Sequence, residues 1–166
     1  KRYECLEKFI FISTDKAVQS TSIMGATKRV GEIITRNQGK GFVVVRFGNV
    51  LGSRGSVIPI WQRQIEKGKP LTVTSPQMTR YMMTIEDAVE LVIQAANIGK
   101  GGEIYALDMG KKVNILEIAK SVVKEAQTDT QITITGVRKG EQLSERLMTL
   151  EEEAVAKKEG KYYVIR

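Results

Sequence analysis

Four consecutive polar residues, Ser13-Thr14-Asp15-Lys16, stand directly behind a short apolar run, Phe9–Ile12. The run is rich in β-branched and aromatic residues, which predicts a strand buried on both faces, as in a parallel sheet. In open α/β sheets, ligands bind just outside the carboxyl ends of the strands. Hydroxyl, carboxyl and amine groups therefore arrive together where a site is expected, and these groups can exchange protons with a substrate.

A second amine, that of Lys28, belongs to the segment that follows. Residues Met24–Asn37 have apolar positions at helical spacing on one side, which predicts an amphipathic helix. Lys28 falls in the first turns of this helix and is able to reach back toward Thr14. Taken alone, it would be an ordinary surface lysine of a helix.

The sequence contains no histidine and one cysteine, Cys5. These counts exclude Ser-His-Asp and Cys-His chemistry, an internal disulfide and a cysteine-based zinc site. Acid–base catalysis would therefore depend on Asp, Glu, Lys, Tyr or water.

Lysine and arginine number 26 against 19 aspartates and glutamates, a net charge of +7. A basic surface suits nucleic acid, anionic lipid or a phosphorylated ligand. The basic residues are scattered, few aromatic residues accompany them and no nucleic-acid-binding pattern occurs, so we expect no nucleic-acid partner. No run approaches the ~20 apolar residues of a membrane helix, so we expect no membrane contact by this chain.

Strands and helices alternate along the first half of the chain. The charged lead-in Lys1–Lys8 is expected to be the tail of a helix. The expected strands are Phe9–Ile12, Phe42–Phe47, Leu71–Thr74, Arg80–Thr84, Glu103–Leu107, Ile132–Thr135 and Tyr162–Ile165. The expected helices are Met24–Asn37, Val57–Lys67, Ile85–Asn97, Ile115–Ala126 with Asn114 as N-cap, and Leu150–Lys158 with Thr149 as N-cap.

This alternation predicts an α/β fold with part of a Rossmann-like parallel sheet. The elements become short and irregular after about Ser53, which predicts a smaller α+β substrate-binding lobe. We expect one domain over residues 1–166, with the sheet in about 1–55 and mainly the lobe in about 56–166.

Further candidate residues lie behind the second predicted strand and later in the chain. Three glycines in Gly48–Gly55 mark a loop where the backbone passes close to another group. Taken alone, the polar candidates would be a turn asparagine and surface charges, although the guanidinium fork of arginine matches two oxygens of a phosphate. They are Asn49, Arg54, Arg80, Arg138 and Glu141.

The stretch from Phe9 to Arg29 resembles the active-site segment of the extended short-chain dehydrogenase/reductase superfamily. Within it, the chain is most similar to the CapD-like group of UDP-N-acetylglucosamine 4,6-dehydratases. The resemblance rests on the strand, the Ser-Thr-Asp-Lys motif and the spacing from Thr14 to Met24 and on to Lys28. The superfamily at large has Tyr at Met24, and a Met there is similar to long membrane-anchored dehydratases and to some epimerases.

The Gly-rich dinucleotide fingerprint, which family members carry upstream of this strand, is missing from the sequence. The resemblance therefore implies that the chain is the C-terminal part of a catalytic domain, and that the fragment alone is inactive.

The resemblance implies a role for each polar group of the motif. Thr14 would supply a hydroxyl near carbon 4 of the sugar, Lys16 the base for the carbon-5 proton, and Asp15 the acid for the carbon-6 hydroxyl. Lys28 would hold the nicotinamide ribose of NAD or NADP and share in catalysis, with Ser13 and Met24 also at the cofactor. Since Met24 cannot take a proton as Tyr would, we hypothesise that Thr14 relays it to Lys28 through water.

The same resemblance implies the contacts of a UDP-sugar. Asn49 would touch the diphosphate or amide groups, with Arg54 beside it. Arg80 and Arg138 would contact the diphosphate, and Glu141 the uridine ribose.

The resemblance favours polysaccharide, capsule or glycan biosynthesis in the bacterial cytoplasm by a homo-oligomeric protein. The whole protein would be either free or tethered to the inner membrane by N-terminal helices outside this sequence. Two alternatives remain open. One is a UDP-sugar epimerase of the same superfamily, and the other, for this fragment alone, is a non-catalytic UDP-sugar-binding or assembly module.

Overall fold

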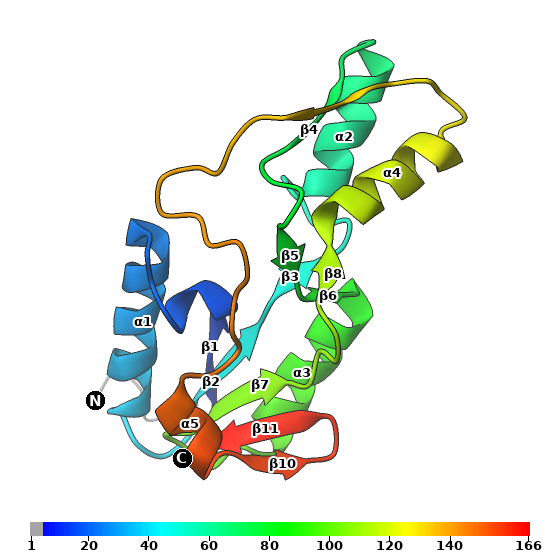
Figure 1. Ribbon diagram of the computed structural model, residues 1–166. Helices are drawn as coiled ribbons and strands as arrows, with labels where there is room; N and C mark the ends of the chain where they lie inside the picture. The colour runs from blue at the N-terminus through cyan, green and yellow to red at the C-terminus, as the bar shows by residue number, and fades with distance from the viewer. Residues whose placement is uncertain (1–4) are drawn as a thin grey trace. The chain divides into compact units, whose positions relative to one another are not determined.

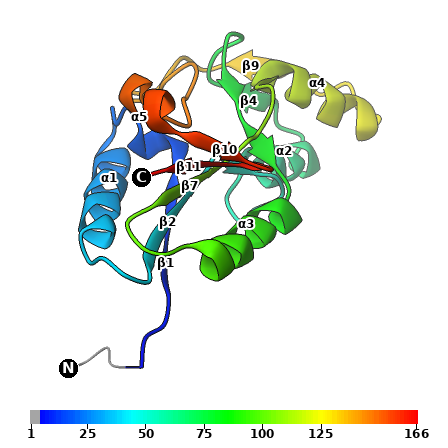
Figure 2. The ribbon, with the colours of Figure 1, turned by 90° about the horizontal axis from the view of Figure 1, so that it is seen from below.

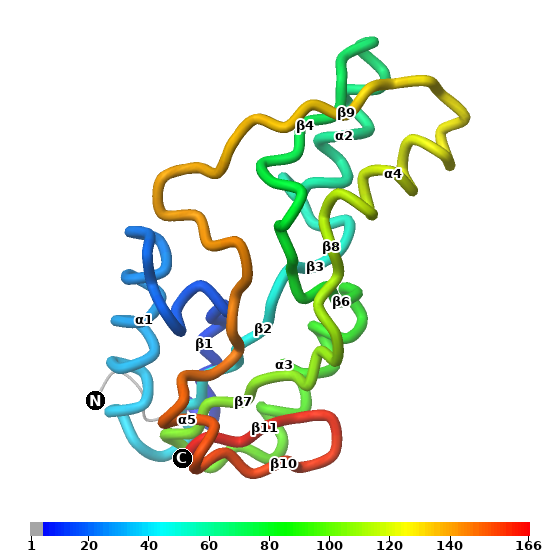
Figure 3. The backbone as a smooth tube through the Cα atoms, viewed as in Figure 1, coloured from blue at the N-terminus to red at the C-terminus, as the bar shows by residue number. Residues whose placement is uncertain are grey.

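The computed structural model describes residues 5–166, which form two compact units (Figure 1). Of these residues, unit 1 comprises those from 5 to 48 with Glu86–Asp108 and Arg146–Arg166, and unit 2 comprises Asn49–Ile85 and Met109–Glu145. The chain leaves the sheet after β2 and returns to it twice. Figure 3 follows the chain as it leaves unit 1 after β2, re-enters with α3 and returns again with α5.

A five-stranded sheet in the order β1-β2-β7-β11-β10 forms unit 1. Strands β1, β2 and β7 are parallel, and β11 and β10 are antiparallel to their neighbours. Helices α1 and α3 lie on opposite sides of this sheet (Figure 2). The elements are β1 (Phe9–Thr14), the 3-10 helix η1 (Asp15–Ala17), α1 (Ile23–Arg36), β2 (Phe42–Phe47), α3 (Ile85–Ile98), β7 (Ile104–Leu107), α5 (Leu150–Val155), β10 (Lys157–Glu159) and β11 (Tyr162–Ile165).

The α/β fold class and the parallel sheet are confirmed, and the β2 run FVVVRF supplies the buried centre of the sheet. Valines 43, 44 and 45 are fully buried, as expected for a strand covered on both faces. The expectation that Phe9–Ile12 is also buried on both faces is wrong in this chain. Phe9 and Ile12 are 41% and 49% exposed because β1 is an edge strand.

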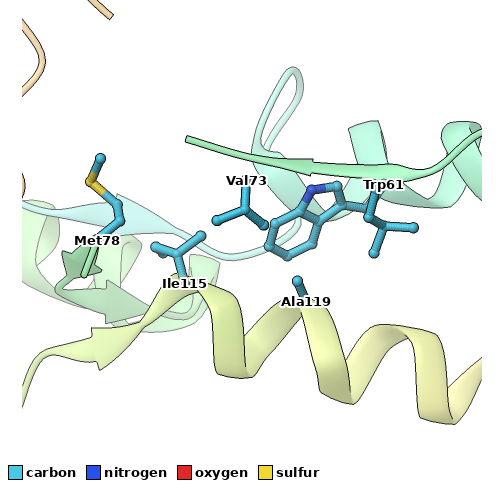
Figure 4. Close-up of a cluster of buried hydrophobic side chains, with 6 residues drawn as sticks. Trp61, Val73, Met78, Ile115 and Ala119 are labelled. Carbon is cyan, nitrogen blue, oxygen red and sulfur yellow. The ribbon is translucent and has the colours of Figure 1, made fainter. Parts of the chain in front are cut away.

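Unit 2 is built from short elements around its own core (Figure 4). It contains a parallel pair β3-β6, a parallel pair β4-β9 and an antiparallel pair β5-β8. The elements are β3 (Asn49–Val50), α2 (Val57–Glu66), β4 (Leu71–Val73), β5 (Thr79–Arg80), β6 (Met82–Met83), β8 (Val113–Asn114), α4 (Ile115–Glu125) and β9 (Ile132–Ile134).

The core of unit 2 forms where α2 and α4 bring their apolar sides against β4. Trp61 of α2 is fully buried, and its indole N–H donates to the carbonyl of Thr72 at 2.8 Å. Figure 4 shows Val73 and Ala119 beside the indole ring. The apolar side chains of both helices therefore stabilise the two-stranded sheets of unit 2. Such short strand pairs are not stable by themselves.

Two predicted helix starts are confirmed by their caps. Asn114 accepts hydrogen bonds from the backbone N–H groups of Leu116 and Glu117. Thr149 and Glu152 form a reciprocal capping box at the start of α5. Both caps satisfy N–H groups that a helix leaves without an internal partner.

Three element predictions need correction. The expected strand Arg80–Thr84 is two short strands, β5 and β6, which pair with different partners. The expected helix Leu150–Lys158 ends at Val155, because residues from Lys157 pair with β11. The expected helix tail Lys1–Lys8 lies partly outside the described residues, and residues 5–8 are not helical.

Candidate active site

The Ser-Thr-Asp-Lys motif sits at the carboxyl end of β1, where the chain turns into η1. The hydroxyl of Thr14 donates to Oδ1 of Asp15 at 3.0 Å, and the ammonium of Lys16 lies 3.0 Å from the same oxygen. The backbone N–H of Lys16 also approaches the Thr14 hydroxyl oxygen, at 3.4 Å. The expected hydroxyl, carboxyl and amine groups are therefore in mutual contact.

Asp15 is only 2% exposed, and its two carboxyl oxygens differ in their surroundings. Oδ1 receives both of the contacts just described, whereas Oδ2 is buried and has no hydrogen-bond partner among residues 5–166. A buried carboxyl oxygen without a donor carries a desolvation cost of about 1–3 kcal/mol. Such an atom is unusual in a native fold and marks a position where a ligand donor is favourable.

Lys28 reaches from α1 back to β1, where it contacts Ile12 and not the expected Thr14. Its ammonium donates to the carbonyl of Ile12 at 2.8 Å and lies 5.0 Å from the ring centre of Phe11. Met24, one turn earlier on α1, is 48% exposed and is therefore not a core residue in this chain. Lys28 thus contacts the strand two positions before Thr14, and Met24 is half exposed on the same helix.

Gly25 brings the first turn of α1 close to the motif. A Cβ atom at this buried position would lie 2.3 Å from the backbone carbonyl oxygen of Lys16. Ser22 caps α1 by accepting from the N–H of Gly25 at 3.1 Å. The glycine therefore permits a close approach between the helix start and η1 that any larger residue would prevent.

A buried ionic network, which was not predicted from the sequence, lies directly behind the motif. Glu32 of α1 and Arg46 of β2 are both fully buried and form a bidentate pair at 2.7 and 2.9 Å. Arg46 also donates to Glu152 of α5, at 2.7 and 3.2 Å. Ser13 donates its hydroxyl to Glu32 at 2.6 Å, and Arg29 bridges Glu32 and Glu152 at the outer side.

The charges of this network favour the ionised forms of Arg46 and Glu152. Burial lowers the pKa of Arg46, but the hydrogen bonds and charges of Glu32 and Glu152 outweigh burial and raise that pKa above its ordinary value. Burial likewise raises the pKa of Glu152, but Arg46, the backbone N–H of Thr149 and Arg29 together lower it below its ordinary value. The sequence held one signal, an arginine inside the otherwise apolar run FVVVRF.

Unit 2 brings three of the five substrate-binding candidates together. Arg80 is 5% exposed and pairs with Glu141 at 3.7 Å and with Glu145 at 3.4 Å. Its guanidinium also donates to the carbonyls of Thr79 and Leu143. The carboxylate of Glu141 accepts from the backbone N–H of Arg138, whose side chain is exposed.

The other two candidates, Asn49 and Arg54, lie in the chain segment that opens unit 2. Asn49 begins β3, is half-buried and donates its backbone N–H to the carbonyl of Tyr81 at 3.0 Å. Arg54 is exposed in the turn between β3 and α2. Their assignment to a sugar nucleotide, like that of Arg80, Arg138 and Glu141, stays a prediction.

Residues 5–166 contain no cluster of three acidic, cysteine or histidine side chains that could hold a metal ion. Within the same residues, every helix is too short or too polar to cross a bilayer.

The model of a family described as "Polysaccharide biosynthesis protein" matches residues 2–166. The chain is 50% identical over 155 residues to the capsular polysaccharide biosynthesis protein CapD of Staphylococcus aureus, covering 89% of this chain and 26% of CapD. It is 53% identical over 153 residues to the probable polysaccharide biosynthesis protein EpsC of Bacillus subtilis, covering 88% and 26%. It is also 38% identical to the UDP-glucose 4-epimerase of Rickettsia felis over 165 residues, covering 95% and 48%.

Two solved structures have the same fold. The structure of Pen from Bacillus thuringiensis superposes with a TM-score of 0.88 at 35% identity, covering 96% of this chain and 52% of Pen. The UDP-glucuronic acid 4-epimerase of Bacillus cereus, in complex with UDP-glucuronic acid and NAD, superposes with a TM-score of 0.73 at 23% identity, covering 89% and 54%. The chain thus spans about a quarter of CapD and EpsC and about half of the other proteins.

Proposed function

Because the chain belongs to the polysaccharide biosynthesis protein family, we propose that the protein containing it is a UDP-N-acetylglucosamine 4,6-dehydratase that uses NAD or NADP. The observation that carries the proposal is the contact of Thr14, Asp15 and Lys16 at the end of β1, with one carboxyl oxygen buried and without a donor. Dehydration needs a base and an acid on neighbouring carbons of a sugar, and this motif contains both.

The residues around β1 fit a nicotinamide cofactor. The Lys28 ammonium, held at the carbonyl of Ile12, is a donor suited to ribose hydroxyls, and the half-exposed Met24 offers an apolar contact on the same helix. When bound, NAD or NADP supplies a reversible hydride acceptor. A cofactor role of Ser13 stays a prediction, since its hydroxyl donates to Glu32.

The ion pair of Lys16 and Asp15 supplies both catalytic forms at once. Transfer of one proton across the 3.0 Å contact converts the ammonium and carboxylate into a neutral amine and a carboxylic acid. Lys16 then takes the carbon-5 proton, and Asp15 gives its proton to the hydroxyl that leaves carbon 6 as water. This step leaves the two residues as the ion pair. When hydride returns to carbon 6, Lys16 gives its proton back to carbon 5, and the proton released by the carbon-4 hydroxyl restores the ion pair, so the full cycle needs no external proton donor.

Unit 2 would bind the nucleotide diphosphate through its exposed guanidinium groups. Arg54 and Arg138 are exposed and suit phosphate oxygens, with Asn49 as an amide contact. Arg80 is buried and paired with Glu141, so in this chain it holds the carboxylate proposed for the uridine ribose. Removal of Arg138 should then weaken UDP binding more than removal of Arg63, an exposed arginine of α2.

Product mass is the direct test of the proposed reaction. The full-length protein is incubated with UDP-N-acetylglucosamine, and mass spectrometry should show loss of one water from the sugar nucleotide. Lys28→Ala should abolish turnover and Lys16→Ala should stop water loss, whereas Lys40→Ala, in an exposed turn of unit 1, should leave the rate unchanged. Normal turnover by the Lys28 and Lys16 variants would refute the assigned roles.

A UDP-sugar epimerase is the second candidate, favoured by the 38% identity to the Rickettsia felis epimerase over 95% of this chain. Epimerisation shares the transient removal of hydride from the sugar but needs no acid and base on neighbouring carbons. A product of unchanged mass and altered configuration would establish it in place of the dehydratase.

A further inference from the structure

We propose that the buried network of Glu32, Arg46 and Glu152 is a positioning device for the catalytic end of β1, and that it acts through the hydroxyl of Ser13. The inference rests on the proposed function, since it concerns the groups that carry out that reaction. None of these four residues needs to touch the substrate for the device to work.

Ser13 is the link between the network and the motif. It precedes Thr14 in the chain, is 3% exposed and donates to Oε1 of Glu32 at 2.6 Å. In the parallel register, Ser13 also lies opposite Arg46 of β2, which binds the same Oε1 at 2.9 Å. The end of β1, just before the catalytic groups, is therefore fixed by a side-chain hydrogen bond in addition to its backbone pairing with β2.

Glu32 extends the same control to the helix that carries Lys28. The two residues are four positions apart on α1, so they lie on one side of the helix, one turn from each other. Lys28 contacts the carbonyl of Ile12 and Glu32 contacts the side chain of Ser13. Side chains from two successive turns of α1 thus contact two successive residues of β1. These contacts fix the position of the helix along the strand.

The third anchor comes from the far end of the sequence. Glu152 closes the capping box of α5 with Thr149 and, with the same carboxylate, binds both NH1 and NH2 of Arg46. The carbonyl of Leu147 accepts a further bond from NH1 at 3.0 Å. Arg46 is thereby held from two sides, so its guanidinium provides a rigid support for Glu32.

Arg29 offers a matched control because it shares the charges of the network without reaching Ser13. Its NH1 pairs with Glu32 at 2.9 Å and with Glu152 at 3.2 Å, and its side chain is 34% exposed. A substitution at Arg29 removes an ion pair from each of the two carboxylates that bind Arg46, those of Glu32 and Glu152. It leaves the bond from Ser13 to Glu32 in place.

The test compares Ser13→Ala with Arg29→Gln in the full-length protein by hydrogen exchange, cofactor binding and kinetics. For Ser13→Ala we expect amides of residues 14–18 to exchange about tenfold faster. We expect kcat to fall about tenfold with KM within about twofold, because misplaced catalytic groups lower the rate without removing binding contacts. For Arg29→Gln we expect exchange at residues 14–18 and kcat within about twofold of wild type.

Three outcomes would overturn the inference. The first is unchanged exchange at residues 14–18 in Ser13→Ala, and the second is an equal fall of kcat in Arg29→Gln, which would indicate general destabilisation. The third is a large loss of NAD affinity in Ser13→Ala measured by calorimetry, which would make Ser13 a cofactor contact instead. If wild type releases no water, the proposed dehydratase fails, but the exchange comparison still decides the positioning role.

Discussion

Replacement of Arg46 by methionine is the most demanding test of the structure of unit 1. The guanidinium makes five hydrogen bonds, to Glu32, to Glu152 and to the carbonyl of Leu147. Methionine fills a comparable elongated space but makes none of these bonds. The substitution leaves two buried carboxylates with only Arg29 as a shared cation.

The expected cost follows from comparing two estimates. Hydrogen bonds to charged groups contribute about 1.5–3 kcal/mol each, so five independent bonds would sum to roughly 7–15 kcal/mol. The bonds share donors and acceptors and are therefore not additive, and the substitution also removes the cost of burying Arg46 itself. Breaking a buried ion pair at one partner costs about 3–5 kcal/mol, and we expect this value for Arg46→Met.

The assay is urea unfolding followed by circular dichroism, with fluorescence of Trp61 as a separate probe of unit 2. With a slope of about 2 kcal/mol per molar urea, the midpoint of the unit 1 transition should fall by about 2 M. Arg63→Met, at an exposed arginine of α2, should leave both transitions unchanged. A loss below about 1 kcal/mol for Arg46→Met would refute the reasoning, because the network would then add almost nothing to the fold.

Three further predictions use other contacts. In Glu152→Gln, the stability deficit relative to wild type should be largest at neutral pH. This deficit should shrink as the pH falls from 4.5, the ordinary pKa of glutamate, through the lower pKa of Glu152 in the folded protein. The free energy of unfolding measured against pH tests this expectation. Gly25→Ala should lower the melting temperature, although alanine favours helices by about 1 kcal/mol, because its Cβ would meet the Lys16 carbonyl oxygen at 2.3 Å. Asn114→Ala should cost about 1 kcal/mol, seen as a shift of about 2–4 °C in the Trp61 fluorescence transition, and no shift would show that the cap is dispensable.

Local patterns in the sequence were sufficient for the parts of the fold that depend on neighbouring residues. Apolar runs placed β1 and β2, and the caps at Asn114 and Thr149 placed the starts of α4 and α5. The contact among Thr14, Asp15 and Lys16 also followed from sequence, because adjacent residues at a strand end remain adjacent in space.

The parts that sequence reasoning missed depend on residues far apart in the chain. Arg46 and Glu152 are 106 positions apart, so no local pattern connects the arginine in the β2 run with the glutamate of a capping box. The exposure of Phe9 and Ile12 depends on which strand forms the sheet edge, which hydrophobicity alone does not specify.

The separation between Arg46 and Glu152 has a consequence for synthesis on the ribosome. At about 5–20 residues per second, roughly 5–20 s pass between the emergence of the arginine and that of its second carboxylate. During that interval β7, which pairs with β2, has emerged, but β11, which pairs with the other edge of β7, has not. Glu32 precedes Arg46 in the chain, so their pair can form first, whereas the bonds from Arg46 to Leu147 and Glu152 have to wait until α5 has been made.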